Sequence, residues 1–496
     1  MPADADAMDV RYNVIQWVHR STRGWSYGNS LTDPRTGEII QGRVSLGSLR
    51  DRQDFLIAEG LLAPYGKGKS ETAKIMEQIV LARLRQLAAH EVGHTLGLQH
   101  NFAASTTNRA SVMDYPAPLV KLGADGIPDI SDAYAHGIGE WDKVTIAYGY
   151  QDFPAGTDEH AALDKILSDA FKRGLVYLTD QDARPASASS SVAHLWDNGA
   201  NVIDGLANVM KVRAAALHRF GENNIREGAP MATLEDVLVP LYMYHRYQVE
   251  AAAKLVGGED YTFSLRGKGD ANLQIISPEE QKRALYAVLE TLKPENLALP
   301  ESLLRLIPPR PPGYPRTRED FRIRTFPTFD ALAPAEAFAN HVCDFLFNQE
   351  RAARIVEFHA RDPQQYPPFD DVLDKILAST WKAPVDTGYH AEIRRTVNMV
   401  VLNELMSLAA NERASNQVRA IAEHSLSLLR DWLLTQRDLT SDENQLAFIV
   451  YAANQIRRFQ DDPKKMNLTK ANDPPDGQPI GMDWWTLSDR DWCDWR

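Results

Sequence analysis

The stretch HEVGHTLGLQHNF, His90 to Phe102, places three histidines and one glutamate within eleven residues. On a helix, residues four apart lie one above the other, so His90 and His94 can offer their imidazoles to one metal ion. Glu91 lies about 100° round the helix, where it can hold a metal-bound water without being a ligand. These residue types predict either a metal site built for chemistry or a buried helix that happens to be rich in histidine.

Gly97 and His100 favour the metal site. Gly97 can adopt a backbone conformation closed to other residues, and the chain can then turn so that His100 returns to the same ion. Three neutral imidazoles plus a water make an open, catalytic Zn²⁺ site rather than a closed structural one. The spacing HExxHxxGxxH fixes five positions and is the signature of metzincin zinc proteases. We therefore predict one Zn²⁺ per chain.

A second motif, SVMDYP from Ser111 to Pro116, follows shortly after the histidines. It matches the methionine turn that lies beneath the zinc in metzincins. We expect Met113 to be a packing floor and not a ligand, because a thioether is a poor match for zinc. The two motifs, adjacent and in this order, strengthen the prediction of a zinc site.

The elements that must position these residues can be read from apolar periodicity. Helical spacing predicts a helix from Ile75 to Leu96, ended by Gly97. Alternation predicts strands from Asp9 to Val18 and from Glu38 to Ser48, so the first 70 residues are expected to be β-rich. A loop-rich region and a short helix around Trp141 to Tyr148 follow.

Beyond Tyr150 the chain becomes mostly helical. Amphipathic patterns predict helices in residues 234–256, 279–292, 335–358 and 390–434. IPPRPPGYP, residues 307–315, is predicted to be a linker or stiff loop. The expected fold is α+β, with a metzincin-like catalytic domain in residues 1–151, a first helical region in 152–310, and a C-terminal helical region with a Trp-rich tail in 311–496.

The composition bounds the classes of protein and partner. The 496-residue chain has a net charge of -13 and no long basic run, which argues against a nucleic-acid or anionic-membrane partner. No apolar run reaches the roughly 20 residues needed to span a bilayer. Two cysteines, Cys343 and Cys493, exclude a disulfide scaffold but leave one isolated bridge open. The oligomeric state is left open.

Most of the chain resembles the bacterial zinc-dependent metalloproteases of the DUF4953 (Met-zincin) type. The resemblance is most specific over the first 150 residues. It rests on HEVGHTLGLQHNFAAS, SVMDYP, DVRYNVIQWVHRSTRGWSYG, DPRTGEIIQGRVSLGS and GIGEWDKVTIAYGY, with PLYMYHRYQVEAAAKLVGG further on. Asn101, directly after the third histidine, departs from the astacin, reprolysin and matrixin patterns.

The resemblance implies a zinc-dependent endopeptidase. Zn²⁺ held by the three histidines would lower the pKa of its bound water, and Glu91 would take the proton and pass it to the leaving amine. The substrate would be an extended peptide or protein, and relatives are exported, which implies a secreted or periplasmic location. The N-terminus, MPADADAMDVRYN, has no signal-peptide pattern. We also expect the first strand and its helix of the family's N-terminal sheet to be missing.

Two further assignments depend on the resemblance. Tyr115, two residues after Met113, has the spacing at which astacin-like enzymes place a catalytic tyrosine; the alternative is a turn tyrosine that packs under the site. The strand Glu38 to Ser48 would be the edge strand above the cleft, and Ile40, Gly42 and Val44 would then contact an added substrate strand.

The remaining candidates have simpler structural interpretations. Asp125, Asp129 and Asp132 could bind Ca²⁺, but their spacing is not that of an EF-hand loop, and a solvated acidic turn is favoured. His136 and His245 are single histidines, which are more often structural. Two rival functions stay open: a zinc hydrolase of a non-peptide substrate, and a scaffold or peptide-binding protein that retains zinc but has little activity.

Overall fold

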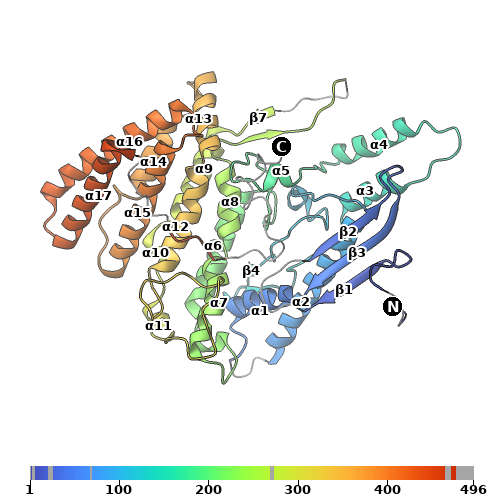
Figure 1. Ribbon diagram of the computed structural model, residues 1–496, viewed down its shortest axis with the longest axis horizontal. Coiled ribbons are helices and arrows are strands. Elements are labelled where there is room, and N and C mark those ends of the chain that lie inside the picture. Colours follow the sequence, from blue (N-terminus) through green and yellow to red (C-terminus); the bar gives the residue numbers. More distant parts are fainter. Residues whose placement is uncertain are drawn as a thin grey trace.

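The computed structural model describes residues 2, 6–19, 26–66, 70–267, 273–463 and 471–475. It is a mixed α+β structure that is mostly helical, with 53% helix and 7% strand. A small sheet lies at one end of the molecule, on the right in Figure 1, and the last helices lie at the other end. This arrangement agrees with the predicted order of a small α+β part followed by a large helical region.

The sheet has the strand order β1-β3-β2, with β1 at Val14–Val18, β2 at Tyr27–Thr32 and β3 at Ile39–Gly47. β1 pairs with β3 in parallel and β2 pairs with β3 antiparallel. The prediction that residues 38–48 form an edge strand is therefore wrong, because β3 is hydrogen-bonded on both sides. β2 was missed in the sequence because YGNSLT contains glycine, asparagine and serine, which are depleted in strands.

The expectation of a β-rich first 70 residues was only partly right. Helix α1, Leu49–Leu62, follows β3 directly and ends at Ala63, which has left-handed backbone angles. Charged residues at the start of α1 hid its helical pattern, although Ala58, Leu61 and Leu62 are buried. Helix α2 is Ser70–Thr95. It begins five residues before the predicted start at Ile75 and ends one residue before the predicted end at Leu96.

The loop-rich region and the short helix after α2 are present as predicted. The segment contains η1 (Ala104–Thr107), β4 (Lys121–Leu122), β5 (Pro128–Asp129), α3 (Glu140–Tyr150), α4 (Glu159–Lys172) and α5 (Asp180–Ala183). β4 and β5 pair with each other. No regular element is assigned between α5 and α6.

The four long helical stretches predicted beyond Tyr150 are helical, but three of them are broken into two helices. The elements there are α6 (Val202–Arg219), η2 (Glu222–Asn224), η3 (Met231–Thr233), α7 (Leu234–Tyr242), α8 (Arg246–Lys254), β6 (Glu259–Tyr261), β7 (Leu273–Ile275), α9 (Pro278–Glu290), α10 (Pro294–Leu297), α11 (Glu301–Leu304), α12 (Ala333–Leu346), α13 (Gln349–Arg361), α14 (Phe369–Ser379), α15 (Gly388–Ala410), α16 (Asn416–Leu439) and α17 (Glu443–Asp461). Side-chain caps explain two of the breaks. Asn348 accepts hydrogen bonds from the first amides of α13, and Ser415 accepts one from Val418 in α16.

One large cluster of buried apolar side chains joins α1 and α2 to helices as distant as α17. It includes Leu61 of α1, Met76 of α2 and Ile456 of α17. The domain boundaries at residues 151 and 310 stay a prediction, and this cluster crosses both of them. A smaller cluster lies beside the predicted metal site and contains Leu87, Phe102, Ala103, Tyr115, Leu178, Ala183, Ala193 and Trp196.

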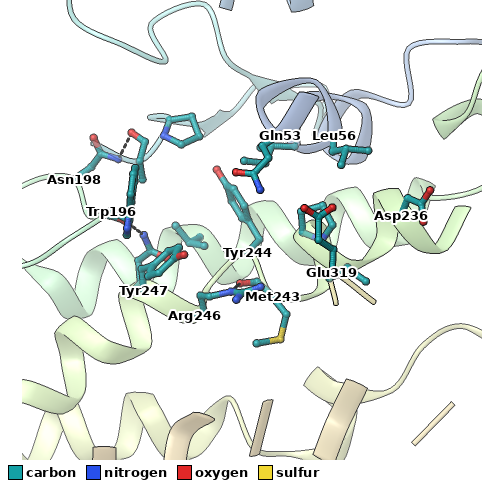
Figure 2. Close-up of a pocket in the computed structure, with 17 residues that line it drawn as sticks. Gln53, Leu56, Trp196, Asn198, Asp236, Met243, Tyr244, Arg246, Tyr247 and Glu319 are labelled. Atoms are coloured by element: carbon teal, nitrogen blue, oxygen red, sulfur yellow. Dashed lines mark hydrogen bonds between the residues drawn. The ribbon is translucent and has the colours of Figure 1, made fainter. Parts of the chain in front are cut away.

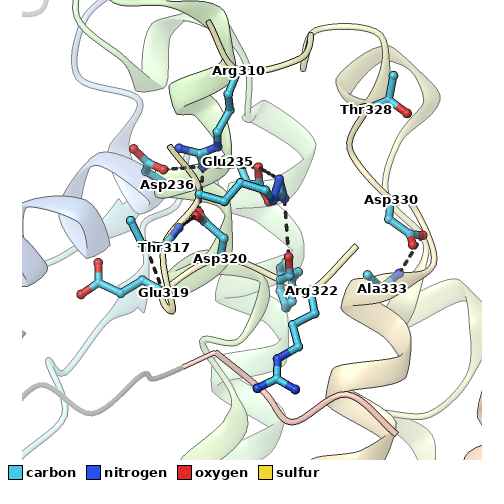
Figure 3. Close-up of polar contacts among 12 residues, drawn as sticks. Glu235, Asp236, Arg310, Thr317, Glu319, Asp320, Arg322, Thr328, Asp330 and Ala333 are labelled. Carbon is cyan, nitrogen blue, oxygen red and sulfur yellow. Dashed lines mark hydrogen bonds and ion pairs between the residues drawn. The ribbon is translucent and has the colours of Figure 1, made fainter. Parts of the chain in front are cut away.

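The proline-rich segment 307–315 is not helical, as predicted. It is held by an ion-pair cluster on α7, shown in Figure 3. Arg310 contacts Asp236 and Asp320 at 2.7 Å each, and Arg316 pairs with Glu235. These three carboxyl groups and two guanidinium groups are largely buried and bonded to one another, so this stiff segment is fixed against α7.

Among the described residues, no helix has the length and apolar character needed to cross a bilayer. Cys343 is buried and has a free thiol. Cys493 and the Trp-rich tail lie outside the described residues.

Arg351 ties the helical region to the loop after α5. Its guanidinium is fully buried and donates to the carbonyls of Phe345, Val256 and Ala186 at 2.8–2.9 Å, and to two more at 3.3 Å. Buried carbonyls that lose a donor carry the full cost of their desolvation. This single side chain therefore joins α8, the α12–α13 junction and the loop.

We expect Arg351→Met to lower the free energy of unfolding by about 3 kcal/mol or more, because several buried carbonyls lose their donor together. The matched control is Arg361→Met on the same helix, whose ion pair with Glu357 is about half exposed. It should change stability by no more than about 0.5 kcal/mol. Urea denaturation of both variants measures the difference, and equal midpoints would contradict the assignment.

Candidate metal centre

The last turns of α2 and the following turn bring three histidine rings together. The Nε2 atom of His94 lies 3.1 Å from Nε2 of His90 and 3.2 Å from Nε2 of His100. Gly97 has a φ of 82°, the left-handed conformation predicted for it, and it lets the chain reverse after α2. The three predicted ligands thus converge on one point.

Each ring is oriented by a hydrogen bond at its other nitrogen. Nδ1 of His90 contacts the carbonyl of Val112 at 2.7 Å, and Nδ1 of His94 contacts that of Leu98 at 2.9 Å. Nδ1 of His100 lies 2.8 Å from a carboxylate oxygen of Asp180. Because these partners only accept, each Nδ1 must carry the proton and each Nε2 presents a lone pair.

This donor set fits a zinc ion. Ligands of a tetrahedral zinc at about 2.05 Å are separated by about 3.3 Å, close to the observed Nε2 spacing. Burial, with the neighbouring histidines, lowers the pKa of His90 well below its usual value. Burial also lowers the pKa of His94 to about 4, so both rings are neutral and able to coordinate near neutral pH.

Glu91 lies beside the histidines and is not one of the converging ligands. Its side chain is 2% exposed, and burial raises its pKa to about 8. The charge of Arg83 and a hydrogen bond from the backbone N–H of Gly28 lower the pKa of Glu91 and so oppose part of this effect. A buried carboxyl with a raised pKa is suited to accept and release a proton, and a nearby divalent cation would stabilise its charged form.

The methionine turn packs directly under α2. Met113 is 1% exposed, and a Cβ added to Gly93 would lie 2.3 Å from its sulfur. The turn is held in place by Asp142, which accepts hydrogen bonds from the hydroxyl of Ser111 at 2.6 Å and from the amide of Val112 at 2.8 Å. The carbonyl of Val112 orients His90. Asp142 therefore positions this proposed metal ligand indirectly, through Val112.

Asp142 also belongs to the capping box of α3, where it accepts from the amide of Gly139 at 2.6 Å. Its sequence signal is the GIGEWDK motif, with an acidic residue at the third helical position. The motif was recognised, but its role beside the metal site was missed because the contact is not local.

Asn101, the residue that departs from other metzincin patterns, is completely buried. Its amide donates to the carbonyl of Met113 at 3.0 Å, and its side chain donates to the carbonyl of Val176 at 2.9 Å. Asn101 therefore joins the turn after His100 to the methionine turn and to the segment before α5.

Comparison with known families decides the relationship. The model of the Met-zincin family (DUF4953) matches residues 72–388, more than half of the chain. The chain belongs to the Met-zincin family. No curated protein and no solved structure matches it. Membership implies a metallopeptidase with peptide substrates, and His90, His94 and His100 form a group that can hold the metal.

In this Met-zincin, Tyr115 lies under the rings of the metal site. Its ring centre is 5.4 Å from that of His90 and 4.9 Å from that of His100, and the residue is 6% exposed. Its hydroxyl accepts a hydrogen bond from Arg184 at 3.0 Å. Burial raises the pKa of Tyr115 to about 12. This position favours the packing interpretation, and direct contact with substrate stays a prediction.

Trp196 supports Tyr115 from below, with ring centres 5.0 Å apart. Trp196 also forms one wall of a pocket behind the methionine turn, shown in Figure 2 with Tyr244 and Tyr247. The aromatic layer therefore continues from the metal site to the junction of α7 and α8.

The three residues predicted to contact an added substrate strand lie on the central strand β3, and their contact with a substrate stays a prediction. Val44 is 3% exposed, and Gly42 faces the side chain of Thr95. Ile40 is exposed on the central strand. It is β2 that crosses α2 at the metal ligands, since a Cβ on Gly28 would lie 2.0 Å from the carbonyl oxygen of Glu91.

The three aspartates considered for calcium do not converge. Asp125 and Asp129 accept amide hydrogen bonds from Ile127 and Ser131 within their own turns, and Asp132 pairs with Arg109 at 3.2 Å. These contacts agree with the acidic-turn interpretation. His245 is completely buried and stacks on Phe338 at 4.1 Å, which agrees with a structural role.

We expect Gly28→Ala to lower the free energy of unfolding by about 2 kcal/mol or more and to reduce zinc content, because the new methyl group would push β2 away from the backbone of α2. The control is Gly149→Ala in α3, where a Cβ would meet nothing within 4 Å. That change should be neutral or stabilising by up to about 1 kcal/mol. Thermal unfolding and metal analysis of both proteins test this; an unaffected Gly28→Ala protein would contradict the close packing of β2.

Proposed function

We propose that this Met-zincin is a zinc-dependent endopeptidase with His90, His94 and His100 as ligands and Glu91 as the proton carrier. The observation that carries the proposal is that Nε2 of His94 lies 3.1 Å from Nε2 of His90 and 3.2 Å from Nε2 of His100. Each of these nitrogens is made a lone-pair donor by the contact at its Nδ1. A histidine-rich structural helix does not need its rings to converge in this way.

When bound at these nitrogens, zinc supplies Lewis acidity that activates water and polarises a carbonyl. The chain's own part in the reaction is proton transfer. Glu91 accepts the proton of the attacking water at a carboxylate oxygen and then donates it to the amine nitrogen that leaves. Its buried position keeps competing water away from this carboxyl.

An extended peptide is the substrate that the fold suits best. β2 is one of the two outer strands in the described part of the sheet, and it is the one whose backbone reaches Glu91, through Gly28. A peptide that pairs with the free edge of β2 would bring a peptide bond toward the ligands. An exported location is proposed from the family resemblance alone.

Two other functions would use the same ligands: hydrolysis of a non-peptide substrate, and peptide binding with little or no turnover. Cleavage of a peptide library with a zinc-free control separates the first from peptidase activity. Peptide binding without turnover would be indicated if zinc-loaded protein bound peptides but cleaved none of them.

We expect purified protein to carry about one zinc per chain, and His94→Ala to lose most of it, because two ligands cannot hold the ion in an open site. Zinc analysis after gel filtration measures both values. The control is His136→Ala, which lies outside the converging group. Full zinc content in His94→Ala would contradict the ligand assignment.

We expect Glu91→Gln to keep its zinc and lower kcat by at least about 100-fold, because general acid–base help contributes about 10²–10⁴-fold. Zinc content and peptide turnover are measured on the same samples. Equal turnover in the two proteins would place the chemistry elsewhere. Zinc lost together with activity would show that Glu91 serves the architecture of the site.

A further inference from the structure

The three proposed ligands are not oriented in the same way. His90 and His94 donate to backbone carbonyls close by in the fold, at Val112 and Leu98. His100 donates instead to the carboxylate of Asp180, eighty residues further along the chain. It is the one ligand of the three whose partner is a charged side chain.

Asp180 is held between His100 and a second set of donors. Its oxygens lie 3.0 and 2.8 Å from Nδ1 of His100, and one also accepts from the hydroxyl of Thr179 at 3.2 Å. Arg184, one turn further on, forms an ion pair with Asp180 through Nε. Nη2 of Arg184 donates to the hydroxyl of Tyr115 at 3.0 Å. The guanidinium carbon lies over the Tyr115 ring, 5.1 Å from the ring centre.

The electrostatics of this chain of contacts favour a charged carboxylate. Arg184 forms an ion pair with one oxygen of Asp180, and both oxygens accept hydrogen bonds from His100, which favours the charged form of the carboxyl group. An ionised carboxylate behind an imidazole fixes the tautomer and makes the ligand a stronger donor.

Helix α5, which carries Asp180, is too short to be stable alone and is fastened to the helical region. Lys254 of α8 is buried and donates to the carbonyls of Ala183 at 2.6 Å and Ala193 at 3.0 Å. The hydroxyl of Tyr261 in β6 donates to Asp182 at 2.7 Å. Arg351 holds the next residues of the loop.

We propose that Asp180 is a positioning residue for His100, and that the helical region sets the third ligand by holding α5. This inference rests on the proposed zinc site. It gives the large helical region, which carries no catalytic motif, a direct part in building the metal centre. The competing explanation is that Asp180 only pairs with Arg184 to stabilise α5.

The first experiment compares Asp180→Asn with Asp236→Asn. Asp180 and Arg184 have side chains 26% and 9% exposed, and the pair of Asp236 on α7 with Arg310 of the segment 307–315 has 29% and 11%. The pairs are thus matched, but only one touches a proposed ligand. An asparagine at 180 would offer only one acceptor to two facing donors, His100 and Arg184.

Zinc affinity is measured on folded protein by competition with a chromophoric chelator, and Co²⁺-substituted protein reports ligand geometry through its visible spectrum. We expect Asp180→Asn to bind zinc about 10- to 100-fold more weakly and to alter the Co²⁺ spectrum. Asp236→Asn should match wild type in both, even if it unfolds more easily. Unchanged zinc affinity and spectrum in Asp180→Asn would overturn the proposal, whereas wild-type protein without zinc would overturn the proposed function instead.

The second arm tests the helical region. Tyr261→Phe removes one hydrogen bond to α5, and Tyr389→Phe removes a comparable one, to the carbonyl of Ala331 at 2.7 Å, away from α5. We expect only Tyr261→Phe to weaken zinc binding, by a few-fold, and to add little in the Asp180→Asn background because both act through Asp180. Equal zinc affinity in the two tyrosine variants would overturn the role of the helical region. The role of Asp180 would still be decided by the comparison of Asp180→Asn with Asp236→Asn.

Discussion

The structure depends on bringing three imidazole nitrogens within 4.8 Å of one another with their lone pairs directed inward. Such an arrangement is unfavourable unless each ring is neutral, has the correct tautomer and is held by a partner on its far side. Burial favours the neutral form of two of the rings by lowering the pKa of His90 and His94. The acceptors at the three Nδ1 atoms meet the other two conditions.

Those acceptors come from three separate parts of the chain, and each explains why a neighbouring element must lie where it does. The carbonyl of Leu98 is presented by the turn at Gly97. The carbonyl of Val112 is presented by the methionine turn, which Asp142 and α3 hold. The carboxylate of Asp180 is presented by α5. The three histidine rings are therefore oriented correctly only when segments close to α2 and segments distant in sequence are all in place.

This division also explains what the sequence could predict. His90, His94 and Gly97 were predictable because helical spacing and a glycine turn are local properties. Asp180 was not, because TDQDAR contains a signal for a helix start but none for a metal site eighty residues away. The edge strand was misassigned because the apolar alternation of residues 38–48 marks a well-packed strand, and the central strand is the better packed one. β2 has little apolar pattern, since its glycine is needed against Glu91.

The metal centre needs more of the chain than the part that carries the histidine motif. A unit ending near residue 151 would contain all three histidines and the methionine turn, yet it would leave Nδ1 of His100 without Asp180 and Tyr115 without Arg184. It would also lack Lys254 and Arg351, which donate hydrogen bonds to the carbonyl of Ala183 in α5 and to that of Ala186 in the following loop. The family match runs from residue 72 to 388 and includes all of these residues. The motif-bearing helix and the helical region are therefore better understood as one structural unit, in which buried cations on α8 and α13 maintain the position of an anion beside the metal site.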